Sequence, residues 1–122
     1  MPSTGERILV CGGRDYSDQK QLFRVLDRLP KPALLIAGGA NGADELARRW
    51  AEARGVPAVI YPANWKGEGR AAGSIRNSRM LEEARPTQVI AFPGSSGTAD
   101  MVRKARAAAV PVSFGDTMEM LS

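Results

Sequence analysis

The segment Val89–Asp100 reads VIAFPGSSGTAD. It starts as an apolar run typical of a buried strand, breaks at Pro93 and Gly94, and continues through small polar residues into a helical pattern. Glycine lets backbone amides approach a ligand closely and adopt positive φ. A helix that begins directly after such a turn presents unpaired N–H groups and the positive end of its dipole. The segment therefore predicts a strand–turn–helix unit that can hold an anion such as phosphate without a cationic side chain.

The same unit occurs twice more, in the segments CGGRDY (residues 11–16) and AGGANGAD (residues 37–44). Each follows an apolar run, and continuous apolar runs are typical of strands buried on both faces of a parallel sheet. The predicted strands are Arg7–Cys11, Ala33–Ala37, Pro57–Tyr61, Thr87–Phe92 and Val110–Phe114. A proline inside the last run, Pro111, indicates an edge strand.

Helical patterns separate the strands. The first has Leu22, Val25, Leu26 and Leu29 on one face, with Asp18 and Gln21 placed like a capping box. The others are expected from Ala43 to near Gly55, over Ala72–Ala84 and over Thr98–Ala108. This alternation predicts one α/β domain over residues 1–122, a sandwich with a parallel five-stranded sheet in the order 3-2-1-4-5.

Composition limits the function classes. No apolar run approaches the ~20 residues of a membrane span, so a cytoplasmic protein that does not engage membranes is expected. The 122 residues include 17 basic and 13 acidic side chains, which favours anionic partners, although a charge of +4 is modest. Histidine is absent and Cys11 is expected to be a core thiol, so neither a metal nor a cofactor is expected.

The carboxyl ends of the strands are where an open α/β sheet binds its ligands. In the order 3-2-1-4-5, the turns after the first and fourth strands frame one crevice. We expect Arg14 and Arg76 to neutralise a bound phosphate, and Asp15 and Asn77 to contact sugar or base. The predicted ligand-binding residues are Gly12, Gly13, Arg14, Gly38, Gly39, Gly42, Asn77, Gly94, Ser95, Ser96, Gly97 and Thr98.

The segment at residues 61–80, YPANWKGEGRAAGSIRNSRM, is expected to be a glycine-rich loop followed by a helix. Asn77 shares a helix face with apolar residues and therefore needs a partner, either a backbone group or a ligand. Arg79 is either functional or part of a solvated face. Trp65 either stacks on a base or covers the sheet edge.

Five motifs in this order, GGRDY, GGANGAD, YPANW, GSIRNSRML and FPGSSGTADM, resemble the YspA/YpsA-related branch of the SLOG superfamily. The resemblance spans residues 8–112 and implies a Rossmann-like fold, often dimeric, that binds nucleotides or nucleotide-derived molecules. The LOG enzymes of this superfamily cleave the bond between base and ribose 5-phosphate, using a PGGxGTxxE signature and a helix arginine that Arg76 matches. Met101 stands at the glutamate position, and Asp15 is the substitute acid if chemistry occurs.

Three functions remain open at this point. The protein acts as a sensor or binding module for a nucleotide-derived ligand, or it hydrolyses an N-glycosidic bond with Arg76 and Asp15 as catalytic residues. The resemblance also extends to the DprA proteins, which bind single-stranded DNA. For that function, the strand path would be lined by Arg14, Lys66, Arg70, Arg76 and Arg79.

Overall fold

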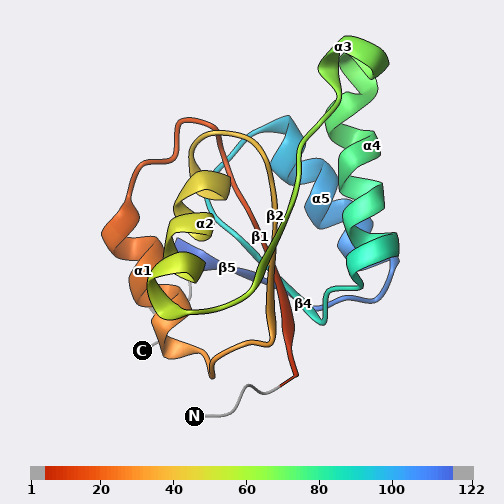
Figure 1. Cartoon of the computed structure of the whole chain (residues 1–122). Coiled ribbons are helices and arrows are strands. Elements are labelled where there is room, and N and C mark those ends of the chain that lie inside the picture. Colours follow the sequence, from red (N-terminus) through yellow and green to blue (C-terminus); the bar gives the residue numbers. More distant parts are fainter. Residues whose placement is uncertain (1–4, 117–122) are drawn as a thin grey trace.

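The computed structural model of the chain describes residues 5–116 (Figure 1). Its five strands form one parallel sheet in the order β3-β2-β1-β4-β5, which confirms the predicted fold class and strand order. Both edge positions are therefore as expected, with β5 at one end and β3 at the other. The strands are β1 (Arg7–Cys11), β2 (Leu34–Gly38), β3 (Ala58–Tyr61), β4 (Gln88–Ala91) and β5 (Val112–Phe114).

Helices cover both faces of this sheet (Figure 1). The helices are α1 (Gln19–Arg28), α2 (Ala43–Arg54), α3 (Trp65–Glu68), α4 (Ala72–Arg79) and α5 (Ser96–Ala107). A 3₁₀ turn, η1 (Gly69–Ala71), links α3 to α4, and a π-helical turn, η2 (Met80–Ala84), follows α4.

Two apolar cores explain why the strands are continuously apolar. Along β1, Ile8 and Val10 point into the core that contains α1 and α2. Leu9 and Cys11 alternate with them and point into the core that contains η2 and α5. Since successive side chains of a strand point to opposite faces, a central strand covered on both sides needs an apolar residue at every position.

The predicted loop over residues 61–71 is wrong in part, because it contains α3 and η1. Asn64 caps α3, and its side-chain oxygen accepts a hydrogen bond from the backbone N–H of Gly67 at 3.1 Å. The predicted helix Ala72–Ala84 is present but ends in the π-helical turn η2, and Arg85 then takes a left-handed conformation with φ 48°. The segment α3–η1 projects beyond the sheet, above the carboxyl ends of the strands (Figure 1).

Only half of the predicted capping box forms at α1. The Asp18 carboxylate accepts a hydrogen bond from the Gln21 backbone N–H at 3.1 Å. The Gln21 side chain does not return to Asp18 but donates to the Gly115 carbonyl at 3.2 Å, which ties α1 to the segment after β5. Within residues 5–116, no helix has the length and apolar character of a membrane span.

Candidate functional site

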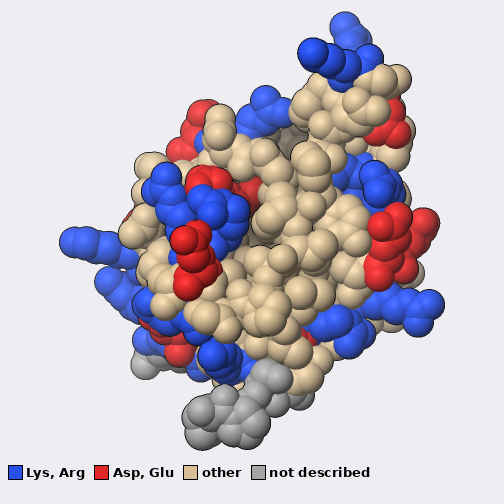
Figure 2. All heavy atoms as spheres, viewed as in Figure 1, with Lys and Arg blue, Asp and Glu red and all other residues tan. Residues whose placement is uncertain are grey.

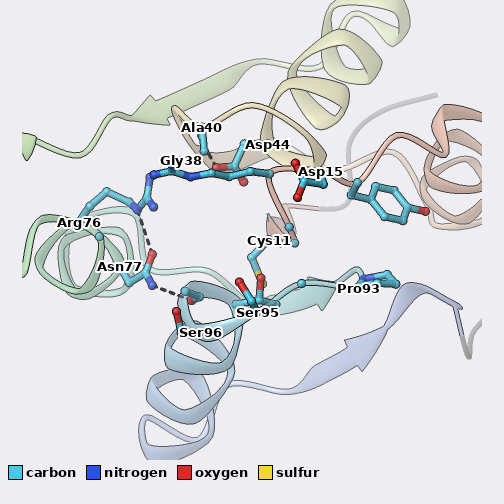
Figure 3. Close-up of a pocket in the computed structure, with 18 of the residues that line it drawn as sticks. Cys11, Asp15, Gly38, Ala40, Asp44, Arg76, Asn77, Pro93, Ser95 and Ser96 are labelled. Carbon is cyan, nitrogen blue, oxygen red and sulfur yellow. Dashed lines mark hydrogen bonds between the residues drawn. The ribbon is translucent and has the colours of Figure 1, made fainter. Parts of the chain in front are cut away.

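A cavity of about 730 Å³ opens at the carboxyl ends of the strands, which is an ordinary size for a small-molecule site. The turns after β1, β2 and β4 contribute to its wall, and α4 closes one side. This is the crevice that the predicted strand order places between the first and fourth strands. Figure 3 shows the cavity between the first turn of α5, the loop after β1 and helix α4.

Most of the predicted site residues line this one cavity. They are Gly12, Gly13, Arg14, Asp15, Gly38, Arg76, Asn77, Gly94, Ser95, Ser96, Gly97 and Thr98.

Two predicted ligand-binding glycines do not line the cavity, and both have packing reasons to be glycine. A Cβ on Gly39 would lie 3.0 Å from Pro62. Gly42 has φ +75°, and a Cβ there would strike the carbonyl oxygens of Gly13 and Arg14. Gly42 therefore lets the turns after β1 and β2 pack backbone to backbone next to the cavity wall.

The first turn of α5 forms the part of the cavity wall that follows β4. Ser95 stands at its N-cap, and no side chain caps the helix N-terminus. A Cβ on Gly94 would lie 2.7 Å from the Gly13 nitrogen and would strike Thr98 Oγ1, so the turn closes only with glycine there. The Gly13 N–H donates to the Pro93 carbonyl at 2.8 Å and thereby joins the β1 and β4 turns. Unpaired amides at a helix start attract anions.

Asn77 has its partners inside the protein. It is 4% exposed, and its amide donates to the Gly97 carbonyl at 3.2 Å and to Asp100 Oδ2 at 3.0 Å. Its oxygen accepts a hydrogen bond from Arg76 Nε at 3.0 Å. Of the two alternatives, a protein partner is therefore present, and Asn77 fixes Arg76 relative to the first turn of α5 (Figure 3).

The two helix arginines differ in position. Arg76 is partly buried, lines the cavity and donates from Nη1 to the Tyr61 carbonyl at 3.2 Å. Arg79 is exposed and does not line the cavity. Its guanidinium lies 5.8 Å from the centre of the Tyr61 ring and 3.3 Å from a Glu83 carboxylate oxygen. The structure thus places Arg79 on the outer face of α4.

Asp44, in the first turn of α2, also lines the cavity and is not among the predicted site residues. Asp44 is 7% exposed, and its Oδ2 accepts a hydrogen bond from the Ala40 N–H at 3.2 Å. Burial raises the pKa of Asp44 to about 6, although the nearby Arg76 and the Ala40 N–H both act against this rise. The available signal was its spacing, because Asp44 lies three and seven residues before the core residues Ala47 and Ala51.

Cys11 lies on the cavity floor and is also part of the core, as expected. Burial is the main cause that raises the pKa of its thiol to about 12; the Asp44 carboxylate adds to this rise and Arg76 opposes it. The thiol is therefore protonated near neutral pH and is a poor nucleophile.

At the mouth of the cavity, Trp65 meets Arg14. The Arg14 guanidinium carbon lies 5.2 Å from the centre of the Trp65 ring, which is a cation–π distance. Trp65 is 49% exposed, lines the cavity and passes over Gly73. It thus lies over the cavity rather than over the sheet edge.

The position of the LOG glutamate lies in the core of this protein. Met101 is fully buried and packs among apolar side chains. The neighbouring Asp100 bonds Asn77 and pairs with Lys104 at 3.1 Å, outside the cavity lining. Among residues 5–116, the cavity therefore has only Asp15 and Asp44 as carboxylates, and no group of three or more metal-ligating side chains occurs there.

Two comparisons with known proteins agree with this architecture. A family model described as "YspA, cpYpsA-related SLOG family" matches residues 6–67, the segment that carries the first two glycine turns and Trp65. The chain is also similar to the Gene 61 protein of Mycobacterium phage D29, with 35% identity over 122 aligned residues that cover 90% of this chain and 97% of the phage protein. The chain therefore belongs to the YspA and cpYpsA-related family of the SLOG superfamily.

Proposed function

We propose that the protein binds a nucleotide or nucleotide-derived ligand in this cavity and acts as a sensor or binding module. The SLOG superfamily binds nucleotide-derived ligands. The observation that carries the proposal is the convergence of an uncapped helix N-terminus and two arginines, Arg14 and Arg76, on one cavity. Such a helix terminus suits a phosphate, and guanidinium groups bind phosphate bidentately.

In this proposal each part of the ligand has a counterpart. The phosphate accepts hydrogen bonds from the backbone amides of the first turn of α5 and from the Thr98 hydroxyl. Arg76 neutralises part of its charge from the α4 side. The base lies at the mouth, where Trp65 offers an exposed aromatic face. Stacking between a base and an aromatic side chain is worth roughly 1–3 kcal/mol and tolerates any base.

Binding without hydrolysis is favoured because the position of the LOG glutamate carries no acid and the predicted substitute, Asp15, is exposed. Met101 supplies no carboxylate, and Asp15 is exposed at the cavity wall, where water competes for it. The alternative, N-glycosidic hydrolysis with Arg76 and Asp15 as catalytic residues, predicts release of free base from a nucleoside monophosphate. Chromatography of an overnight incubation with the protein separates the two functions.

A thermal-shift panel tests the proposed binding. The panel holds nucleoside monophosphates, ribose 5-phosphate, ADP-ribose and a short DNA strand. A ligand at about a hundred times its Kd stabilises by roughly 2.7 kcal/mol, which raises the Tm of a domain this size by several degrees. We expect a shift with at least one nucleotide-derived compound. No shift with any small phosphate compound at millimolar concentration would refute the proposal.

Gly97→Asp locates the phosphate. Nothing lies within 4 Å of a Cβ at this position, and Gly97 is in the first turn of α5. An acidic residue there complements the helix dipole and replaces a helix glycine, so stability should be kept or raised by a few tenths to about 1 kcal/mol. The same carboxylate repels a phosphate, so the ligand-induced shift should vanish.

The matched control is Gly97→Ala, which adds the methyl group without the charge and should keep the ligand-induced shift. If Gly97→Asp bound the ligand as the native protein does, the phosphate would not lie at α5.

Single-stranded DNA is the rival ligand. Arg79 pairs with Glu83, and basic and acidic side chains are interspersed on the face shown in Figure 2, without a continuous basic track. A strand binder that contacts several phosphates loses affinity steeply with salt, whereas a single-phosphate pocket loses less. A thermal shift that occurs only with DNA and is abolished by 200 mM salt would favour the DNA-binding alternative.

The homodimer implied by the family resemblance remains a prediction, which light scattering of the purified protein checks.

A further inference from the structure

Asp44 is a carboxylate that a phosphate site does not need. It lies on the cavity wall beside Gly38 and the guanidinium of Arg76 (Figure 3). A negative charge there opposes the binding of any anion, and burial of a charge is unfavourable unless the group is paired and hydrogen-bonded. Its position in the cavity therefore indicates a hydrogen-bond donor other than phosphate as its partner.

The protein satisfies only part of this carboxylate. Within residues 5–116, the Ala40 N–H is its one hydrogen-bond donor, and that bond goes to Oδ2. Arg76 is near enough to influence Asp44 electrostatically, but it donates to Tyr61 and Asn77 and forms no salt bridge with Asp44 in the described chain. An ionised carboxylate has about four acceptor sites, and buried polar groups are almost always bonded.

The shape of the wall keeps Asp44 accessible from the cavity. A Cβ on Gly38 would lie 2.8 Å from Asp44 Oδ2 and would strike Arg76 Nη1, so the glycine leaves both groups uncovered. In Figure 3, Cys11 lies between Asp44 on one side and Ser95 with Ser96 on the other. The carboxylate and the first turn of α5 thus face the cavity from different sides, with Trp65 at the mouth.

We infer that Asp44 accepts a hydrogen bond from a sugar hydroxyl of the ligand whose phosphate lies on the first turn of α5, so that the cavity selects sugar phosphates over phosphate alone. This inference rests on the proposed function. A sugar hydroxyl is the neutral donor nearest to the phosphate in any nucleotide. Asp44 and the first turn of α5 line the same cavity, so one sugar phosphate bound there would present its phosphate to the helix and a hydroxyl to the carboxylate.

Calorimetric titration with inorganic phosphate and with ribose 5-phosphate tests this assignment. The native protein should bind ribose 5-phosphate at least tenfold more tightly than phosphate. Asp44→Asn should weaken the binding of ribose 5-phosphate roughly tenfold, because a hydrogen bond to a charged acceptor is replaced by a neutral one. The same variant should bind inorganic phosphate as tightly as the native protein or more tightly, because a nearby negative charge is gone.

The test is specific because the variant should weaken the binding of ribose 5-phosphate without weakening that of inorganic phosphate. If the affinity for both compounds rose equally, Asp44 would act only through its charge. If both affinities fell equally, Asp44 would have a structural role. Either result overturns the inference. Asp44→Ala should give the same split as Asp44→Asn, and Glu52→Gln on the exposed side of the same helix is the matched control for charge. If the native protein bound neither compound, the proposed function itself would fail, whereas phosphate binding without a sugar preference would refute only the role of Asp44.

Discussion

Asp44→Asn is expected to stabilise the folded protein, most strongly at alkaline pH. Burial raises the pKa of this carboxyl from 3.8 to about 6, with Arg76 and the Ala40 N–H opposing the rise. Because the folded-state pKa lies above the unfolded one, ionisation of Asp44 disfavours the fold as pH rises from about 4 through 6. A difference of about two pKa units corresponds to about 3 kcal/mol once the group is ionised in both states.

The asparagine keeps an oxygen for the Ala40 N–H and removes the charge. We expect the free energy of unfolding to exceed that of the native protein by about 3 kcal/mol at pH 8, by roughly half as much at pH 5 and by less than 1 kcal/mol at pH 4. Urea unfolding at the three pH values measures this difference, and the slopes should agree between the two proteins. Glu52→Gln, an exposed change on the same helix, should stay within about 0.5 kcal/mol at pH 8.

Two outcomes would contradict this prediction. A variant that is less stable than the native protein at pH 8 would show that Arg76 stabilises the ionised carboxylate by more than burial disfavours it. A gain that does not change between pH 4 and pH 8 would show that ionisation of Asp44 is not the cause. In either case Asp44 would no longer be a good candidate to accept a hydrogen bond from a ligand hydroxyl.

Other predictions concern three positions around the cavity. Gly42→Ala should lower the free energy of unfolding by more than about 2 kcal/mol in urea, because φ is +75° and the Cβ meets backbone carbonyl oxygens, while Gly97→Ala should cost nothing. Asn77→Ala should cost about 2–4 kcal/mol by the same assay, because it removes the side-chain donor to the Gly97 carbonyl, one of the donors to Asp100 and the acceptor of Arg76 Nε. A loss of ligand affinity at unchanged stability would instead assign Asn77 to the ligand. Trp65→Ala should weaken binding of a nucleoside monophosphate five- to tenfold in calorimetry and leave ribose 5-phosphate unaffected; an equal loss for both compounds would contradict stacking on the base.

The strand–turn–helix units were predictable because their signals are local. The apolar runs, the glycine pairs and the helical spacing each depend on neighbouring residues, and the right-handed crossover rule then limits how parallel strands connect. Short elements were less predictable. The helix α3 begins at one capping residue, Asn64, and η2 ends at Arg85, which has a left-handed conformation. In each case the pattern in the sequence is a single residue, which is too weak to predict the element.

The candidate site was predictable to a similar extent. Glycines in the turns after β1 and β4 line the cavity, because the strand order places those two turns side by side. Gly39 and Gly42 look the same in the sequence, yet Gly39 lets its turn pack on Pro62 and Gly42 lets its turn pack on the turn after β1. A glycine that admits a ligand and one that admits another backbone give the same local pattern.

Hydrophobic periodicity and turn chemistry act over a few residues, so the sequence alone was enough to predict the alternation of strands and helices, the parallel sheet and the edge of the sheet that carries the cavity. Three features could be seen only in the folded chain: Asn77 is held between α4 and α5, Met101 lies in the core, and Asp44 lies buried beside Arg76. The physical reason is that burial and the pKa of a side chain depend on which distant segments cover it. For Asp44 those segments are the Gly38 turn and helix α4, which the chain brings together only when the sheet is complete.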